Sequence, residues 1–381
     1  MKDQSNPSLQ LISVPWWNAT AYYAVTVAKL LYQAGKKVYV GGTPLSPPLR
    51  VAEEYRLPTF ARIHLQSKKP NELLRSFHRL KEFVLKEQIR IIDAHRPEDH
   101  LFAGLLRKKF PELVVVRTVG DVRPPKTNPI NKWLHLSSTD FFIFSSRANQ
   151  KRYQNIWPIP EDRCAVIYAG VDTAYFHSNQ KIPSLREKLG IPADHIVFGL
   201  IGRFSPVKDH QTFLRAAAAL LQQTDSASFV ISGEEVEISR EQLLQFAKDL
   251  GIAKNVHFLD KQDDVRRAIS AIDVGVVSSR GSEAICRIAT EYLSMGKPVI
   301  VSDVNVLPEM ITAGFDGWIF PPGSAQDLAQ CMARFSENPA LLKEMKKNAR
   351  QTAEKRFSED HFLQETLAAY QQALELKKEK R

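Results

Sequence analysis

The chain has 381 residues, of which 44% are hydrophobic and 25% are charged, and its formal net charge is +10. This length is enough for two domains with separate cores, and no apolar run reaches the length of a membrane span. The three cysteines, Cys164, Cys286 and Cys331, are too scattered for a disulfide framework or a zinc site, so a soluble, cytoplasmic protein is expected.

The first half of the chain alternates apolar strands with helices. A buried strand is expected at 9–14 and a helix at 20–33. Further strands are expected at residues 37–42, 59–65, 90–95, 114–120, 141–146 and 164–168, with a helix at 71–88. This alternation predicts a doubly wound parallel sheet. The first strand is not followed by G-x-G-x-x-G, which argues against a nicotinamide dehydrogenase.

Two tryptophans follow the first strand directly. Trp16 and Trp17 are candidates for the floor of an acceptor site or for a membrane-facing surface. The alternative is a loop plug that packs on the core.

A polar group follows the strand at 90–95. His95 ends this strand, and Arg96, Asp99 and His100 come directly after it. Ligands of open α/β sheets bind at the carboxyl ends of the strands, so we expect His95 to point into an interdomain cleft. His100 is an equal candidate for the contact, and either histidine has an alternative role in the core.

The second half repeats the alternation. Strands are expected at residues 196–204, 228–232, 256–259, 274–279, 298–302 and 318–320, with a final amphipathic helix from residue 358. The chain therefore predicts one domain over residues 1–178 and another over residues 179–357, both of the same α/β class.

Charged side chains follow two strands of this second domain. Gly202, Arg203 and Lys208 come after the strand at 196–204, and Glu283 and Glu291 come after the strand at 274–279. If the sheet is parallel, these side chains share one edge. The two glutamates are about 12 Å apart along a helix axis, which is too far for a shared proton and suits two parts of an extended ligand.

The segment from Gly281 to Gly296 is expected to form a helix that starts near Glu283. The amides of Ile285, Cys286 and Arg287 would then form an anion site, with the Arg287 side chain adding a positive charge. The alternative is that Glu283 completes an N-cap begun by Ser282 while Glu291 is a solvated helix residue.

The ordered pair of motifs, G-R-x4-K at 202–208 and E-x7-E at 283–291, resembles the donor-binding half of family 4 retaining glycosyltransferases with the GT-B fold. The resemblance implies two Rossmann-like domains that face each other across a cleft, with the last helix, 358–381, crossing back onto the first domain. It implies that Arg203 and Lys208 hold the donor diphosphate, that Glu283 contacts the donor sugar and that Glu291 contacts the ribose. It further implies a cleft histidine at His95, close to the acceptor and to the transferred sugar.

The chain departs from the family pattern at three places. Asp209 stands where the family usually has glycine, Ile285-Cys286 replaces the usual Phe-Gly, and Trp16-Trp17-Asn18-Ala19 replaces a Gly-Gly pair near the donor phosphate. Asn18 and the Ala19 amide are expected to serve in place of the glycine pair.

The resemblance predicts an enzyme that moves a sugar from a nucleotide-diphosphate sugar to a hydroxyl group and retains the anomeric configuration. No Asp-x-Asp motif stands where one is expected, so no metal and no cofactor is predicted, and cationic side chains would neutralise the leaving group. The catalytic candidates are His95, Arg203, Lys208 and Glu283, and the acceptor candidates are Trp17, His95, Arg96 and His100. The alternatives are a nucleotide-sugar epimerase or phosphorylase of the same fold, or a non-catalytic protein that binds nucleotide sugars or nucleic acid.

The positive charge lies in the first half. Residues 1–178 contain 26 Lys and Arg against 15 Asp and Glu, whereas residues 179–381 contain 26 against 27. The basic runs Lys68-Lys69 and Arg107-Lys108-Lys109 are not interleaved with aromatic residues, so nucleic acid is not expected. An anionic membrane surface and a phosphorylated glycolipid acceptor, of the kind used in lipopolysaccharide synthesis, are expected instead. The alternative is that the basic surface only keeps the protein soluble.

Overall fold

The computed structural model describes residues 6–178, 182 and 185–379. The chain divides into two compact units, Met1–Gly170 with Glu359–Arg381, and Val171–Ser358. The chain thus first crosses from one unit to the other between Gly170 and Val171, a few residues before the expected boundary at 178. Val171 is held within the second unit, because its amide donates to the Phe357 carbonyl at 2.7 Å and it pairs with Ser358.

The first unit contains a parallel sheet that is seven-stranded in the described residues, in the order β3-β2-β1-β4-β5-β6-β7. Its strands are β1 (Ser8–Leu11), β2 (Val38–Gly41), β3 (Thr59–Phe60), β4 (Ile91–Ala94), β5 (Val114–Val119), β6 (Phe141–Phe144) and β7 (Cys164–Val166). Its helices are α1 (Ala19–Gln33), α2 (Pro47–Glu54), α3 (Pro70–Lys86), α4 (Pro97–Lys109), α5 (Pro129–Leu136), α6 (Arg147–Gln154) and α14 (Glu359–Glu379). β3 is shorter than the strand expected at 59–65, since the chain leaves the ladder after Phe60.

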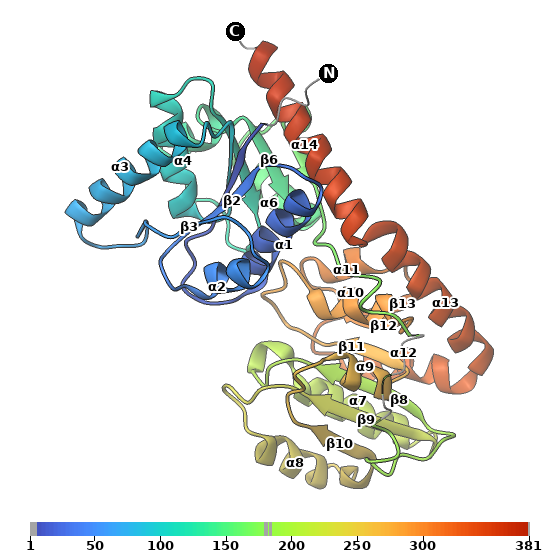
Figure 1. Cartoon of the computed structure of the whole chain (residues 1–381). Coiled ribbons are helices and arrows are strands. Elements are labelled where there is room, and N and C mark those ends of the chain that lie inside the picture. Colours follow the sequence, from blue (N-terminus) through green and yellow to red (C-terminus); the bar gives the residue numbers. More distant parts are fainter. Residues whose placement is uncertain (1–5, 179–181, 183–184, 380–381) are drawn as a thin grey trace. The chain divides into compact units, whose positions relative to one another are not determined.

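The two faces of this sheet differ in chemistry. Leu9 and Leu11 face an apolar core that includes Phe102 and Leu106 of α4. Gln10, between these leucines, faces the other way. That face is covered by α1 and α14, which lie beside each other (Figure 1) and pack together. The last helix thus completes the first unit.

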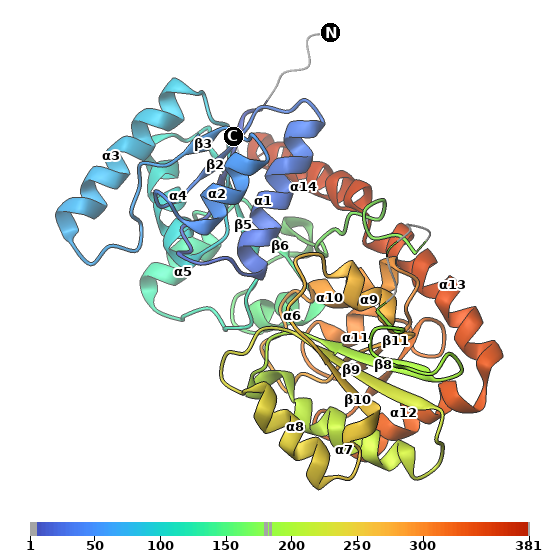
Figure 2. The same cartoon turned by 60° about the horizontal axis from the view of Figure 1, so that its bottom comes forward.

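The second unit contains a parallel sheet that is six-stranded in the described residues, in the order β10-β9-β8-β11-β12-β13. Its strands are β8 (Ile196–Ile201), β9 (Ala227–Ser232), β10 (Val256–Leu259), β11 (Val274–Val277), β12 (Val299–Ser302) and β13 (Gly317–Phe320). Its helices are α7 (His210–Leu221), α8 (Arg240–Asp249), α9 (Arg266–Ala271), α10 (Arg287–Ser294), α11 (Leu307–Met310), α12 (Ala325–Glu337) and α13 (Pro339–Arg356). Figure 2 shows β10, β9, β8 and β11 side by side, with α7, α8 and α12 below them.

Both sheets are doubly wound, as the sequence predicts. In the first, the chain order reverses between β1 and β4, and in the second it reverses between β8 and β11. Ligands of such sheets bind outside the carboxyl ends of the strands at this reversal. The two candidate sites therefore follow from topology: one after β1 and β4, and one after β8 and β11. Of the helices that the structure describes, none has the length and apolar character needed to cross a membrane.

Candidate functional site

The loops after β8 and β11 are tied to each other. The Arg280 amide donates to the Val207 carbonyl at 2.9 Å, and the Ser278 hydroxyl donates to the Lys208 carbonyl at 2.9 Å. The Lys208 ammonium pairs with the Glu283 carboxylate. The structure thus brings together two residues that are 75 positions apart in the sequence.

Asp209 shows how the chain manages without the usual glycine. Its φ is +52°, in the left-handed region that favours glycine. The Asp209 carboxylate compensates in two ways: it accepts from the Thr212 amide at 3.3 Å, which caps α7, and it pairs with the Arg280 Nε at 2.6 Å. The helix cap and the ion pair therefore stabilise the loop although it lacks the glycine that is usual in the family.

The loop after β8 brings two cations, Arg203 and Lys208, to this edge. Burial, the largest single influence, lowers the pKa of Lys208, but the nearby charge of Glu283 and lesser contributions outweigh it and raise the pKa above its usual value. Lys208 is therefore an ammonium at neutral pH. Arg203 is exposed in the same loop, and its positive charge opposes the rise in the pKa of Lys208. Gly202 leaves open space, because a Cβ placed there would meet only the Lys208 side chain, at 3.8 Å.

Helix α10 begins at Arg287, so the expectation that Glu283 starts this helix is wrong. Ser282 has φ +62° and breaks the helical path. Glu283 then lies in the loop, 6% exposed, where its carboxylate also accepts from the Ser279 hydroxyl at 2.7 Å. The amides at the start of α10 are consequently those of residues 287–289, and those of Ile285 and Cys286 precede the helix.

Glu291 is not a solvated helix glutamate. It is 5% exposed on α10, and its carboxylate accepts from the Arg287 guanidinium at 3.1 Å. Burial raises the pKa of Glu291, while the charge of Arg287 opposes this shift. A buried carboxylate with one cationic partner is suited to bind hydroxyl donors.

Ile285 and Cys286 are both buried in the loop before α10. Burial, reinforced by the charge of Glu283, raises the pKa of Cys286 to about 12. The thiol is therefore protonated at neutral pH and is unsuited to act as a nucleophile.

In the first unit, His95 lies directly after β4 and its side chain is buried. Its Nε2 is 2.9 Å from the Gln10 Oε1, while its Nδ1 has no hydrogen-bond partner among the described residues. Burial lowers the pKa of His95 to about 4, although the charge of Asp93 opposes the shift. His95 is therefore neutral at pH 7.

His100 has a different environment, in the core between α4 and α5. Its Nε2 lies 2.6 Å from the Thr139 hydroxyl, and its ring packs edge-on against His135 with the centroids 5.1 Å apart. Burial holds the pKa of His100 well below its usual value. His100 therefore has the role in the core that the sequence left open as an alternative.

Arg96 and Asp99 flank the start of α4. Arg96 is its N-cap residue and lies 3.7 Å from Glu98. Asp99 is fully buried and accepts from the Ser13 amide at 3.3 Å. Burial raises the pKa of Asp99 to about 7, against the opposing effect of its hydrogen bond to Ser13.

The loop after β1 is open to solvent. Trp16 is 54% exposed and Trp17 is 37% exposed, so neither is a plug packed on the core. The Asn18 side-chain carbonyl accepts from the Ala21 amide at 2.9 Å and thereby caps α1. Asn18 thus has a local role at the helix start where we expected a ligand contact.

Polar residues inside the strands were not predicted as functional from the sequence. Gln10 in β1 and Asp93 in β4 are fully buried and contact Tyr370 of α14. A signal was present, because polar residues within buried apolar strands are uncommon and require partners.

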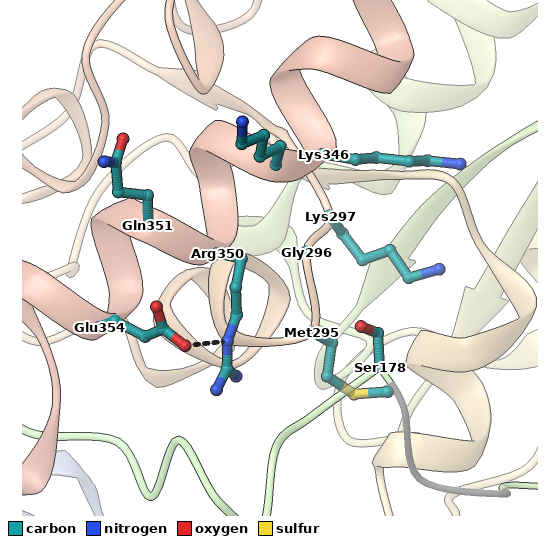
Figure 3. A pocket seen from close by; sticks show the side chains of 9 residues that line it. Ser178, Met295, Gly296, Lys297, Lys346, Arg350, Gln351 and Glu354 are labelled. Carbon is teal, nitrogen blue, oxygen red and sulfur yellow. Dashed lines mark hydrogen bonds and ion pairs between the residues drawn. The ribbon is translucent and has the colours of Figure 1, made fainter.

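A cavity of about 560 Å³ lies elsewhere in the second unit, at the carboxyl end of α10 (Figure 3). Its lining includes Lys297, Lys346 and Arg350. These cations hold structural partners: Lys297 donates to the Ile272 carbonyl at 2.6 Å, Lys346 pairs with Asp273 at 2.7 Å, and Arg350 donates to the Ser294 carbonyl at 2.6 Å. Burial lowers the pKa of Lys297 to about 8. This cavity lies away from the sheet's carboxyl edge, so we do not assign the ligand site to it.

Comparison with known proteins agrees with the two motifs of the second unit and also covers the first unit. Residues 20–175 match the family model of Glycosyltransferase Family 4, and residues 181–352 match that of Glycosyl transferases group 1. A D-inositol 3-phosphate glycosyltransferase of Saccharomonospora viridis is 27% identical over 265 residues, covering 67% of this chain and 61% of that protein. An uncharacterised glycosyltransferase of Methanocaldococcus jannaschii is 27% identical over 241 residues, covering 61% and 60%. The matches thus span about three fifths of the length of these curated relatives.

Solved structures share the fold over nearly the whole chain. A glycosyltransferase of Rickettsia africae has a TM-score of 0.86 at 20% identity and covers 97% of this chain and 99% of its own. Anabaena HepE, solved in complex with UDP, has a TM-score of 0.83 at 20% identity and covers 96% and 99%. The two family models, the two doubly wound sheets and the paired motifs lead to one conclusion: the chain belongs to the family 4 glycosyltransferases with the GT-B fold.

Proposed function

We propose that the chain transfers a sugar from a nucleotide-diphosphate sugar to a hydroxyl group of a glycan or glycolipid, with retention of configuration and without a metal ion. The observation that carries this proposal is the edge after β8 and β11, where Arg203, Lys208 and two buried glutamates gather. The structures of Anabaena HepE with UDP and with UDP-glucose support a donor of this class.

Each residue has a distinct task in this proposal. Arg203 and Lys208 neutralise the departing diphosphate, and removing one such group typically costs about 10²–10³ in rate. Glu283, held next to Lys208, accepts hydrogen bonds from the donor sugar, and Glu291 accepts them from the ribose. The acceptor hydroxyl attacks from the face that the diphosphate leaves, which gives retention without a protein nucleophile. His95 contacts a hydroxyl of the acceptor.

The test begins with binding and ends with stereochemistry. UDP, GDP and ADP are titrated calorimetrically against the matching monophosphates, and we expect one diphosphate to bind at least about tenfold more tightly than its monophosphate, because each charge-assisted hydrogen bond contributes about 1.5–3 kcal/mol. NMR of UDP-glucose, or of the sugar conjugate of the preferred base, then follows transfer to an acceptor or to water. Retention predicts that the first product keeps the donor's anomeric configuration.

Other outcomes contradict the proposal. Conversion of the donor sugar without release of diphosphate indicates an epimerase, and turnover that requires inorganic phosphate indicates a phosphorylase. Tight diphosphate binding without turnover under any acceptor condition indicates a binding protein.

We also propose an anionic membrane surface as the place where the acceptor is met. Of the eleven large apolar side chains exposed in the described residues, eight lie in the first unit, including Trp16, Trp17, Leu74 and Leu85. Leu74 and Leu85 are exposed on α3 beside Arg75 and Lys86, in the half of the chain that carries the excess positive charge. A helix with exposed leucines and cations suits a surface of anionic headgroups, which favours a phosphorylated glycolipid acceptor of the kind found in lipopolysaccharide synthesis.

A further inference from the structure

A buried polar chain connects α14 to His95 within the first unit. Because side chains alternate along strands and Gln10 pairs with Asp93 in register, Gln10 and Asp93 share one sheet face, and His95, two residues further, continues it. This is the face that α1 and α14 cover. Tyr370 of α14 reaches down to it and contacts both Gln10 and Asp93.

The hydrogen bonds along this polar chain of side chains can run in only one direction. As a carboxylate, Asp93 can only accept, and it does so from the Thr118 hydroxyl at 2.7 Å and from the Tyr370 hydroxyl at 2.7 Å. The Tyr370 hydroxyl has a single proton, so its oxygen must accept from the Gln10 side-chain NH₂, at 2.7 Å. The amide of Gln10 is thereby oriented, and its Oε1 faces the Nε2 of His95 at 2.9 Å.

The direction of the hydrogen bonds in the polar chain determines the tautomer of His95. Since the Gln10 Oε1 can only accept, the His95 Nε2 must carry the proton. The Nδ1 is then a lone pair, and it is the ring atom that has no partner among the described residues. A buried acceptor left without a hydrogen bond costs about 1–3 kcal/mol, so a donor that reaches it is bound favourably.

We propose that Gln10 and Tyr370 are positioning residues, which hold His95 as the neutral Nε2–H tautomer so that Nδ1 accepts a hydrogen bond from a sugar or acceptor hydroxyl. The hydroxyl contact rests on the proposed function; the tautomer does not. The other groups around the ring agree with a neutral His95. The charges of Asp93 and Arg117 act on it in opposite directions, and Tyr23 of α1 packs near it with the ring centroids 6.2 Å apart.

The C-terminal helix thereby acquires a role beyond covering the sheet. Tyr370 lies 360 residues from Gln10 in the sequence, and it sets the state of His95 only when α14 is docked. Removing its hydroxyl should allow the Gln10 amide to rotate and both tautomers of His95 to form.

The test reads the tautomer directly. The full-length protein is labelled with ¹⁵N-histidine, and the ring nitrogens are recorded at pH 7.5, with the His95 signals assigned by their loss in His95→Asn. We expect the Nε2 of His95 to be protonated and the Nδ1 not. In Tyr370→Phe we expect both ring nitrogens to shift toward the average of two tautomers. The matched control is Tyr23→Phe, which removes a buried hydroxyl that donates to the Ile167 carbonyl and lies outside the polar chain.

Kinetics supplies the second measurement. We expect Tyr370→Phe to lower kcat about tenfold, corresponding to about 1.4 kcal/mol of lost orientation, while diphosphate affinity, a property of the second unit, stays unchanged and shows that the protein is folded. Tyr23→Phe should retain kcat.

Three results would overturn the proposal: a protonated Nδ1 in the wild type, unchanged ring nitrogens in Tyr370→Phe, or equal effects of the two tyrosine variants. A protein with the expected tautomers but no transferase activity would contradict the proposed function and leave the Gln10–Tyr370 control of His95 standing. If transfer occurs but is insensitive to Tyr370→Phe, the hydroxyl contact at Nδ1 is wrong.

Discussion

At the scale of single residues, the candidate donor site consists of buried carboxylates held by cations. Glu291 is buried next to Arg287, and Glu283 is buried next to Lys208 and Ser279. Removing a group of this kind affects binding strongly, because its partner is left with an unmade charge-assisted hydrogen bond.

We expect Glu291→Ala to weaken binding of the donor diphosphate roughly 10- to 150-fold, because a hydrogen bond to a charged group contributes about 1.5–3 kcal/mol. Calorimetric titration with the preferred nucleoside diphosphate measures this loss. Glu354→Ala is the matched control, since it removes an exposed glutamate that also pairs with an arginine four residues away. A folded Glu291→Ala protein with wild-type affinity would rule out the ribose contact.

At the scale of elements, the start of α7 depends on Asp209. This residue occupies a left-handed position, caps the helix and pairs with Arg280. Glycine and alanine both remove the cap and the ion pair, but only alanine has to bear the left-handed backbone.

We expect Asp209→Ala to lower the free energy of unfolding by about 1–2 kcal/mol: about 1 kcal/mol for the cap, and up to about 1 kcal/mol because alanine tolerates the left-handed backbone less well than aspartate. Asp209→Gly should lose less than half of that amount, because glycine adopts this conformation readily. Urea unfolding of both variants measures the difference. Equal losses would mean that the backbone at Asp209 carries no strain.

At the scale of the whole molecule, buried neutral histidines couple stability to pH. Burial is the largest cause of the lowered pKa in each of four histidines: His95, His135 and His210, all at about 4, and His100, well below its usual value. In the unfolded chain these groups take up protons near pH 6.5. The unfolded state therefore binds more protons below that pH, and stability falls as the pH decreases from about 6.5 to about 4.

We expect the urea midpoint of unfolding to decrease steadily between pH 6.5 and pH 4.5. Asp99 acts in the opposite direction, because its pKa is raised to about 7 in the folded state and its contribution to stability is lost as the pH rises from about 4 to 7. Asp99→Asn removes this opposing effect and should steepen the decline. A midpoint that is constant over this range would contradict the assignment of neutral buried histidines.

The proposed membrane contact also belongs to the scale of the whole molecule, since it would depend on the charge of an entire unit. We expect sedimentation with anionic liposomes and none with neutral ones, with binding that fades as salt rises. Replacing Arg75 and Lys86 by glutamine should weaken partition roughly 30-fold, at about 1 kcal/mol per charge. The control replaces Lys343 and Lys355, two exposed lysines of the second unit, by glutamine. Equal sedimentation with both lipids, or equal effects of the two double variants, would remove this role from α3.

The sequence by itself determined the fold and the edge on which the donor residues lie. Strand, loop and helix recur at short range, so their order predicts two parallel sheets, and the residues after β8 and β11 reach one edge because parallel strands end together. The family could be predicted because G-R-x4-K and E-x7-E are local patterns in the sequence. The two family models confirm this prediction. The assigned roles of Arg203, Lys208, Glu283 and Glu291 remain predictions.

Tertiary structure decided what each of these residues touches. The sequence could not show that the helix begins only at Arg287, because Glu283 in the preceding loop pairs with Lys208, which is distant in the chain. Nor could the sequence distinguish the roles of His95 and His100. Their rings differ in their hydrogen-bond partners, which are Gln10 for His95 and Thr139 for His100, and only the folded chain brings these partners together. The partners Gln10 and Tyr370 are 360 residues apart, and a hydrogen bond over that separation leaves no local pattern. Short-range order fixes the elements, whereas the protonation and pairing of buried polar groups depend on which side chains the completed fold brings within about 3 Å.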